Sequence, residues 1–170
     1  MLTHSGNEWK SVVWNDMRLN VCGGGPCGAT GSGCSTVVFK PKWQHDSGCK
    51  KRSESDISAD ASVRTPLAVY SSVLPGTKTH PGSHWLGIAG TSLAAPMIAA
   101  MIGLAGNASS LHGAEEIWEH HESLTSVLKG TNVYVPVTGA CASKVRYICV
   151  AGQGYDGPAG WGTPRDVSDL

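Results

Sequence analysis

Ser92 is the residue of this sequence best placed to do chemistry. It lies in Gly90-Thr91-Ser92, and from Leu93 to Ala105 the chain is almost entirely apolar, which predicts a helix buried on most of its sides. Ser92 is therefore expected at the N-terminus of a buried helix, where free backbone N–H groups and the helix dipole favour developing negative charge. Such a hydroxyl can act as a nucleophile, but serine is also a common N-cap residue.

Histidines offer a second candidate for chemistry, because four side chains that can bind metals fall close together in the sequence. They are His112, Glu116, His120 and His121. Their spacing is not the His-Glu-x-x-His pattern of zinc peptidases, so the solvated polar face of a helix is the favoured interpretation. A glycine-rich stretch at 22–36 could cradle a phosphate, but it lacks the Lys-Ser/Thr ending of a phosphate loop.

The cysteines fall into three close pairs, which are Cys22 with Cys27, Cys34 with Cys49, and Cys141 with Cys149. Local pairing as disulfides is the simplest arrangement, and it suits an oxidising compartment. Zinc binding is the competing interpretation. The spacing of the first pair is loose for a zinc site, and no Cys-x-x-Cys occurs in the sequence, so disulfides are favoured.

Length and charge limit the classes of function. The 170 residues suffice for one domain with a proper core, and 13 basic residues balance 13 acidic ones. This balance gives no reason to expect nucleic acid or an anionic membrane as a partner, and no apolar run is long enough to span a bilayer. Residues 1–8 have neither the basic head nor the apolar middle of a signal peptide, which suggests that the chain starts late.

Apolar and β-branched runs predict a buried strand at 65–70 and a short strand at 85–89, which leads directly into the serine turn. Gly106 is expected to end the helix that follows. A second helix is predicted at 113–122, a hairpin or loop excursion at 124–150, and a series of turns in the tail. A strand, a turn and a buried helix in succession are typical of an α/β domain.

Several short motifs occur along the chain in a fixed order, namely Trp14-Asn15, Gly31-Ser32-Gly33-Cys34-Ser35, Lys40-Pro41-Lys42-Trp43-Gln44, Asp56-Ile57-Ser58-Ala59-Asp60, Gly90-Thr91-Ser92 and Gly152-Gln153-Gly154-Tyr155-Asp156-Gly157-Pro158. Together they resemble the sedolisin (serine-carboxyl peptidase) family of the subtilisin-like superfamily. The resemblance implies a loop-rich α/β fold, in which a parallel sheet is flanked by helices. It implies one partial peptidase domain over residues 1–170.

The resemblance also implies a chemistry, hydrolysis of peptide bonds, usually at acid pH. In that family a serine attacks, a glutamate acts as general base with an aspartate supporting it, and another aspartate helps to stabilise the oxyanion. Ser92 matches the nucleophile. No Glu-x-x-x-Asp and no Ser-Gly-Asp precede Ser92, so the chain resembles the C-terminal half of the catalytic domain. We expect no peptidase activity at an enzyme-like rate from it alone.

The implied partners are a polypeptide substrate and the missing N-terminal part of the domain, with no nucleic acid and no membrane. The alternative function is that of a non-catalytic peptidase remnant, which acts as a structural or binding module. Because the family's enzymes are secreted or lysosomal, and because the cysteines are paired, we expect a secreted protein.

A calcium site near the C-terminus is the last implication of the resemblance. Gly152 and Gly154 would offer backbone carbonyls and Asp156 a carboxylate, and these are oxygen ligands suited to Ca²⁺. Ser126 and Val127 fall at about the positions where the family supplies a further aspartate and the carbonyl after it. We expect the loss of that carboxylate to weaken the site. The alternative is an ordinary glycine turn with Asp156 as a capping residue.

Overall fold

The computed structural model describes residues 2–5, 8–23, 25–74, 76, 81–82, 84–133, 141 and 145–170, with side chains from residue 10 onward. Its strands are β1 (Leu2–Ser5), β2 (Glu8–Ser11), β3 (Cys34–Phe39), β4 (Lys51–Ser53), β5 (Leu67–Tyr70) and β6 (Trp85–Ile88). Its helices are α1 (Thr91–Ala105), α2 (Ala114–Glu119) and the 3₁₀ turns η1 (His121–Ser123), η3 (Arg146–Ile148) and η4 (Val167–Asp169). No described helix is long and apolar enough to cross a membrane.

The described strands form three separate antiparallel pairs, β1 with β2, β3 with β4, and β5 with β6. The parallel sheet that the sequence led us to expect is therefore not present among the described residues. Each pair joins strands that are neighbours in the sequence, and strands that turn straight back on each other pair antiparallel, because a parallel pair needs a crossover connection.

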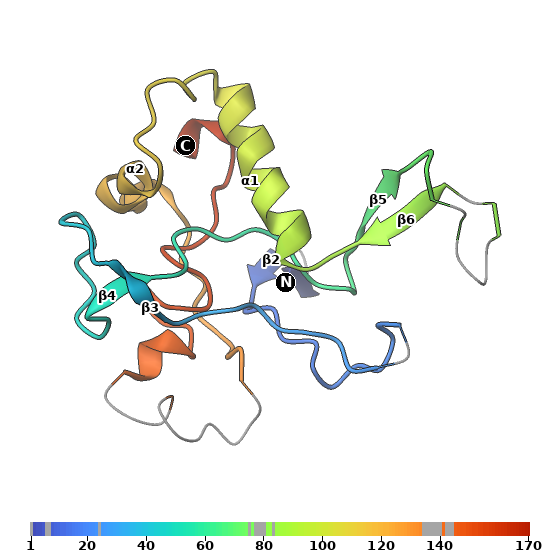
Figure 1. The fold of residues 1–170 in the computed structure, drawn as a ribbon, viewed down its shortest axis with the longest axis horizontal. Coiled ribbons are helices and arrows are strands. Elements are labelled where there is room, and N and C mark those ends of the chain that lie inside the picture. Colours follow the sequence, from blue (N-terminus) through green and yellow to red (C-terminus); the bar gives the residue numbers. More distant parts are fainter. Residues whose placement is uncertain are drawn as a thin grey trace.

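The β5–β6 hairpin projects away from the other elements (Figure 1). The prediction of a strand at 85–89 is confirmed, and β6 leads into α1 through Gly90. The prediction of a buried strand at 65–70 is wrong about burial, because every residue of β5 is exposed. Hydrophobic side chains at this density indicate a strand, but they do not show whether another element packs against that strand.

Helix α1 ends where the sequence predicts, because Gly106 adopts the left-handed conformation of a C-cap, with φ 77°. It is not buried on most of its sides, which corrects the expectation drawn from its apolar sequence. Only Leu93 and Ile98 are buried. Leu104, near the C-terminal end of the helix, is 77% exposed.

The centre of the structure is built from an extended segment, residues 54–62, and the turns of the tail. The Trp161 N–H donates to the Asp56 carbonyl at 2.9 Å, and the Ser58 N–H donates to the Gly162 carbonyl at 2.8 Å. The prediction of successive turns in the tail is confirmed, since the described chain from 151 to 164 forms turns and isolated bridges without a helix. A small apolar core lies alongside and consists of Val13, Val127, Ala159 and Ala151.

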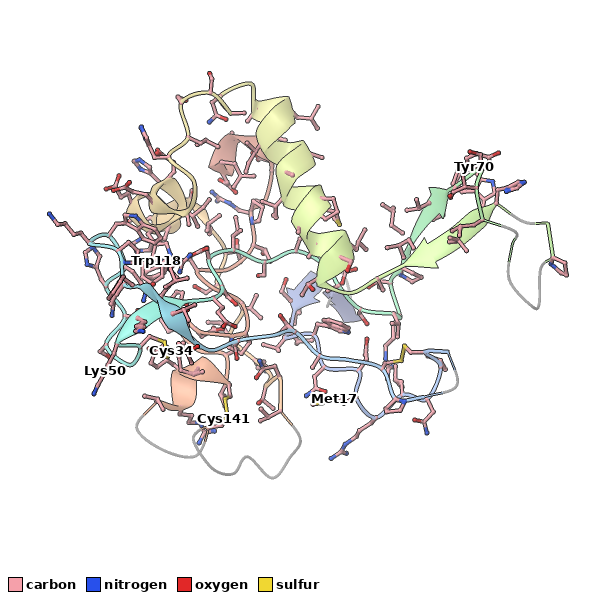
Figure 2. The ribbon with its side chains drawn as sticks, in the orientation of Figure 1. Met17, Cys34, Lys50, Tyr70, Trp118 and Cys141 are labelled. Carbon is pink, nitrogen blue, oxygen red and sulfur yellow. A yellow bond between two sulfur atoms is a disulfide. The ribbon has the colours of Figure 1, made fainter. Side chains whose placement is uncertain are left out.

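The second predicted helix is shorter than expected, because α2 covers only six residues and η1 follows it as a separate turn. Its buried residue is Trp118. Figure 2 shows Trp118 within the part of the molecule formed by α2, β3 and β4. Its ring lies near other aromatic rings, at centroid distances of 5.8 Å to Trp43, 4.5 Å to Tyr155 and 5.4 Å to Trp161.

All three predicted disulfides are present, Cys22–Cys27, Cys34–Cys49 and Cys141–Cys149. Each closes a short loop, with sequence separations of 5, 15 and 8 residues. The last one ties the excursion predicted at 124–150, although residues 134–140 and 142–144 of that excursion lie outside the described part. The zinc interpretation of these cysteines is wrong.

Candidate active site

Ser92 is the second residue of α1, and its side chain is exposed. The alternative that Ser92 caps the helix is wrong, because the N-cap residue is Gly90 and no side chain forms a cap hydrogen bond. Gly90 has φ 83°, a conformation that favours glycine, and it turns the chain sharply from β6 into the helix. The Ser92 hydroxyl forms no hydrogen bond with any residue that the structure describes.

The backbone at the start of α1 leaves two N–H groups available beside this hydroxyl. The N–H groups of Leu93 and Ala94 donate to the Gly90 carbonyl at 2.9 and 3.3 Å. Those of Thr91 and Ser92 have no acceptor within the described residues. Together with the positive end of the helix dipole, such groups can stabilise an oxyanion that forms next to the Ser92 Oγ.

A buried carboxylate positions the turn that carries Ser92. Asp16 accepts hydrogen bonds at one oxygen from the Trp14 indole at 2.7 Å and from the Ser62 hydroxyl at 2.8 Å. The residue before Ser62, Ala61, then accepts the Gly90 N–H at 2.7 Å. Because these bonds join three segments that are distant in sequence, they hold the serine turn in a fixed place.

A cavity of about 710 Å³ lies beside the first turns of α1 and is lined mainly by apolar side chains. Its carboxylates come from one segment, at Glu54, Asp56 and Asp60. Asp56 is already engaged, because it accepts the Trp118 indole N–H at 2.6 Å and pairs with Arg52 at 2.5 Å. No described histidine or carboxylate forms a hydrogen bond with Ser92, so the site has a nucleophile without a visible base.

The residues predicted to bind calcium lie on two adjoining segments. Thr125 and Thr163 exchange backbone hydrogen bonds at 2.9 Å, which brings residues 125–127 against the turn at 156–163. Val127 is buried in the small apolar core. Asp156 is only 2% exposed, and its two oxygens accept N–H groups from Gly152 at 3.1 Å and from Ala159 at 2.9 Å.

The donor set at Asp156 fits a cation in part. Burial raises the pKa of the Asp156 carboxyl to about 6, against the effect of the backbone hydrogen bonds from Gly152 and Ala159. A buried carboxylate in this state gains from a nearby positive charge. Neighbouring carbonyls, such as those of Gly152 and Gly154, are hard oxygen ligands of the kind that Ca²⁺ accepts. One carboxylate alone makes a weak site.

The histidines do not gather into a metal site. Among the described residues, no three His, Cys, Asp or Glu side chains form a group that could hold a metal ion. His120 pairs with Glu116 at 3.1 Å on the helix surface, as expected for a polar face. His121 is different, because its ring stacks on Trp161 at a centroid distance of 3.7 Å.

Sequence reasoning missed the contact that anchors Asp56. Asp56 belongs to one of the motifs of the sequence, and in the structure its carboxylate bonds to Arg52 and Trp118. The Trp118 partner comes from 62 positions further along the chain. No local pattern could reveal it, although a tryptophan on the apolar side of a short acidic helix is a signal for a buried anchor.

Comparisons with known proteins are informative for solved structures. Neither a protein-family model nor a curated protein matches the chain. Among solved structures, the chain is similar to a Pseudomonas sedolisin, a serine-carboxyl proteinase complexed with two molecules of pseudo-iodotyrostatin. The TM-score is 0.68 and the sequence identity 28%, over 94% of this chain and 39% of the Pseudomonas chain. This similarity supports a sedolisin-like α/β fold, of which the chain spans about two fifths of the length.

Proposed function

We propose that this chain is the nucleophile-bearing part of a serine-carboxyl peptidase domain, with Ser92 as the attacking residue. The proposal rests on one observation, the exposed Ser92 hydroxyl at the start of α1, next to backbone N–H groups that find no acceptor among the described residues. The similarity to the Pseudomonas proteinase supports it. The proposal also covers the reaction, which is cleavage of polypeptides at acid pH, and the place of this chain, which is the C-terminal part of a domain with a subtilisin-like parallel sheet. It further includes secretion, with which the three disulfides are compatible.

In this proposal the Ser92 Oγ attacks the carbonyl carbon of a peptide bond, and the hydroxyl proton passes to a base. The carbonyl oxygen becomes an oxyanion, which the N–H groups at the start of α1 stabilise. Pro96 has no N–H to donate to the Ser92 carbonyl, so the first turn of the helix is held less tightly there. Without a base the serine stays protonated and nucleophilic attack is slow, so the chain alone is expected to be inactive.

The test combines the chain with the N-terminal part of the Pseudomonas sedolisin catalytic domain and measures hydrolysis of an unfolded protein at pH 3 to 6. We expect hydrolysis by the mixture, and its reduction by about 10³-fold or more in Ser92→Ala, because the nucleophile is lost. Ser109→Ala, an exposed serine after the end of α1, is the matched control and should leave the rate unchanged. Hydrolysis that survives Ser92→Ala would contradict the proposal.

The alternative is a non-catalytic remnant that serves as a structural or binding module. The observation that favours it is the absence of any described base in contact with Ser92. A mixture that forms a defined complex but never hydrolyses the substrate would support this alternative.

We also propose that Ca²⁺ binds at Asp156, with the carbonyls of Gly152, Gly154 and Val127 and the residue Ser126 around it. The single carboxylate makes binding weak, and pH controls it, because Ca²⁺ requires the ionised form. When bound, Ca²⁺ would neutralise the charge of Asp156, and the backbone N–H groups of Gly152 and Ala159 would still orient the carboxylate.

The pH dependence of stability tests the role of Asp156. Its pKa is about 6 in the folded state, above the ordinary 3.8, so the folded chain holds this proton more tightly than the unfolded chain. Stability from Asp156 is therefore fully present below about pH 4 and falls as the pH rises to 6, by about 2–3 kcal/mol. Urea unfolding of the wild type and Asp156→Asn, compared across this range, should show the step only in the wild type.

Calcium should act in the opposite pH range. Above pH 6 Asp156 is ionised, and added Ca²⁺ is expected to raise the melting temperature, whereas at pH 4 it should have no effect. Asp156→Asn should remove this response, and Asp166→Asn, an exposed carboxylate near the C-terminus, should keep it. An equal response in both variants would show that Ca²⁺ does not bind at Asp156.

A further inference from the structure

The hairpin of β3 and β4 exposes three consecutive apolar side chains. It lies on the side of the molecule opposite the β5–β6 hairpin (Figure 1). At the end of β3, Val37 is 74% exposed, Val38 54% and Phe39 83%. One exposed apolar side chain is ordinary on a protein surface, but a contiguous group is typical of a contact surface.

Positive charge gathers around these apolar side chains. Five of the 13 basic residues of the chain lie between residues 36 and 52, and Asp46 is the only acidic residue in that stretch. Phe39 pairs with Lys51 across the hairpin, and the Lys51 Nζ lies 5.6 Å from the centre of the Phe39 ring. The charged and the apolar surface are therefore in direct contact.

Asp46 does not offset this charge at the surface. Its side chain is 1% exposed, and its carboxylate pairs with the Lys40 Nζ at 3.1 Å. It also accepts the Tyr147 hydroxyl at 2.6 Å and the backbone N–H of Cys49 at 2.8 Å. The negative charge of Asp46 is thus satisfied inside the loop that joins β3 to β4.

Three lysines remain as cations beside the apolar side chains. Lys42 and Lys50 are exposed, and neither forms an ion pair with a described residue. Lys51 is half-buried, and its Nζ donates to the Thr36 carbonyl at 2.5 Å. Figure 2 shows Lys50 at the outer edge of the molecule. The β3–β4 patch, as we call this surface, consists of Val37, Val38, Phe39, Lys42, Lys50 and Lys51.

Acidic side chains lie at the margins of the β3–β4 patch rather than within it. Glu54 follows β4, and its carboxylate lies beside Gly33, at the end of the hairpin opposite Phe39. Helix α2 packs on this part of the molecule through Trp118 and Trp43. No ion pair among the described residues joins the glutamates of α2 to the lysines of the patch.

We propose that the β3–β4 patch binds the surface of a lipid bilayer that contains anionic lipids. The headgroups of such lipids attract lysines, and apolar side chains become buried at the boundary between headgroups and acyl chains. An acidic polypeptide would pair with the lysines but would leave the three apolar side chains in water. Those side chains therefore favour the bilayer as the partner.

This inference departs from the expectation of no membrane partner. That expectation came from the net charge of the whole chain, which does not show where the charges lie. The contact is interfacial, so it needs no spanning helix. It is also independent of the proposed peptidase function, because Ser92 takes no part in it.

The test measures partition of the full chain onto vesicles by sedimentation. One set of vesicles contains phosphatidylcholine alone, and the other contains phosphatidylcholine mixed with phosphatidylserine. We expect partition onto the anionic vesicles to be about 100-fold stronger, because three lysines contribute about fivefold each. Added salt should weaken it, since salt screens the attraction.

Two variants separate the charged from the apolar contribution. Lys42→Gln combined with Lys50→Gln should weaken partition onto the anionic vesicles about 25-fold. Phe39→Ser should weaken it about 10-fold at low and at high salt, because burial of the phenyl ring does not depend on charge. Both variants replace exposed side chains, and circular dichroism should show the wild-type fold.

Matched controls come from outside the β3–β4 patch. Val73, which follows β5, is 85% exposed, and Lys129 is also exposed. Val73→Ser and Lys129→Gln should partition as the wild type does. If Phe39→Ser and Val73→Ser partitioned equally, general adhesion of exposed apolar residues would account for binding, and the inference would be overturned.

Two further results would contradict the bilayer as the partner. One is partition onto the anionic vesicles that is no stronger than onto phosphatidylcholine alone. The other comes from soluble polyglutamate. If the chain bound polyglutamate as tightly as the anionic vesicles, and Phe39→Ser left both unchanged, the patch would be a site for an acidic polypeptide instead.

Discussion

Replacing Gly160 by alanine is expected to lower the free energy of unfolding by about 3–5 kcal/mol, enough to unfold a marginally stable domain. Gly160 has φ +63°, and an added Cβ atom would lie 2.2 Å from the carbonyl carbon of Asp56 and 2.7 Å from the nitrogen of Ile57. These neighbours are backbone atoms, so no side chain can rotate away. The extended segment 54–62 would have to separate from the tail at Asp56 and Ile57.

Gly106→Ala is the matched control for this substitution. Gly106 also has a positive φ, +77°, but nothing lies within 4 Å of its added Cβ. It should lose only the conformational preference of glycine, about 1 kcal/mol. Urea unfolding followed by circular dichroism measures both variants. Similar losses at Gly160 and Gly106 would mean that the tail does not pack against Asp56 as closely as described.

Truncation of Trp118 to alanine should cost about 3–5 kcal/mol, the second large effect. Trp118 is 3% exposed and packs among the rings of Trp43, Tyr155 and Trp161. Its removal leaves a cavity, and it also takes away the indole N–H that Asp56 accepts at 2.6 Å. Because Asp56 lies within the extended segment at the centre of the fold, both losses act on the same place.

Two further variants separate these contributions. Trp118→Phe keeps an aromatic ring in the cluster but removes the N–H and part of the buried indole, so it should cost about 1–3 kcal/mol. Trp85→Ala truncates a tryptophan of the exposed hairpin, 60% accessible, and should cost about 1 kcal/mol or less. Thermal unfolding ranks the three. If Trp118→Ala were no worse than Trp85→Ala, the aromatic cluster around Trp118 would not contribute to stability as described.

Local signals explain what could be predicted from the sequence. The stop at Gly106, the strand that runs into the serine turn and the three disulfides each depend on residues close together in the chain. The same holds for the position of Ser92 near the start of a helix. Glycine geometry, capping and short loop closure act over a few residues, so a sequence reveals them directly.

Long-range contacts explain what could not be predicted. The apolar sequence of α1 indicates that something covers it, but not that Leu104 and most other residues of the helix remain unburied in the described structure. Asp56 belongs to a short motif of the sequence, but its bond to Trp118 depends on how two distant segments pack. The carboxylate Asp16, which holds the serine turn, is likewise defined by Ser62, 46 positions away.

The disulfides also determine how the chain would come apart. All three lie within local loops, two before residue 50 and one after residue 140, and no described cysteine remains to link these regions. A single peptide-bond cut anywhere between residues 50 and 140 therefore produces two fragments without a covalent link. Non-covalent contacts hold them together, such as those of Asp56 with Trp118 and Trp161 when the cut falls between residues 56 and 118, and a denaturant would separate them without any reductant.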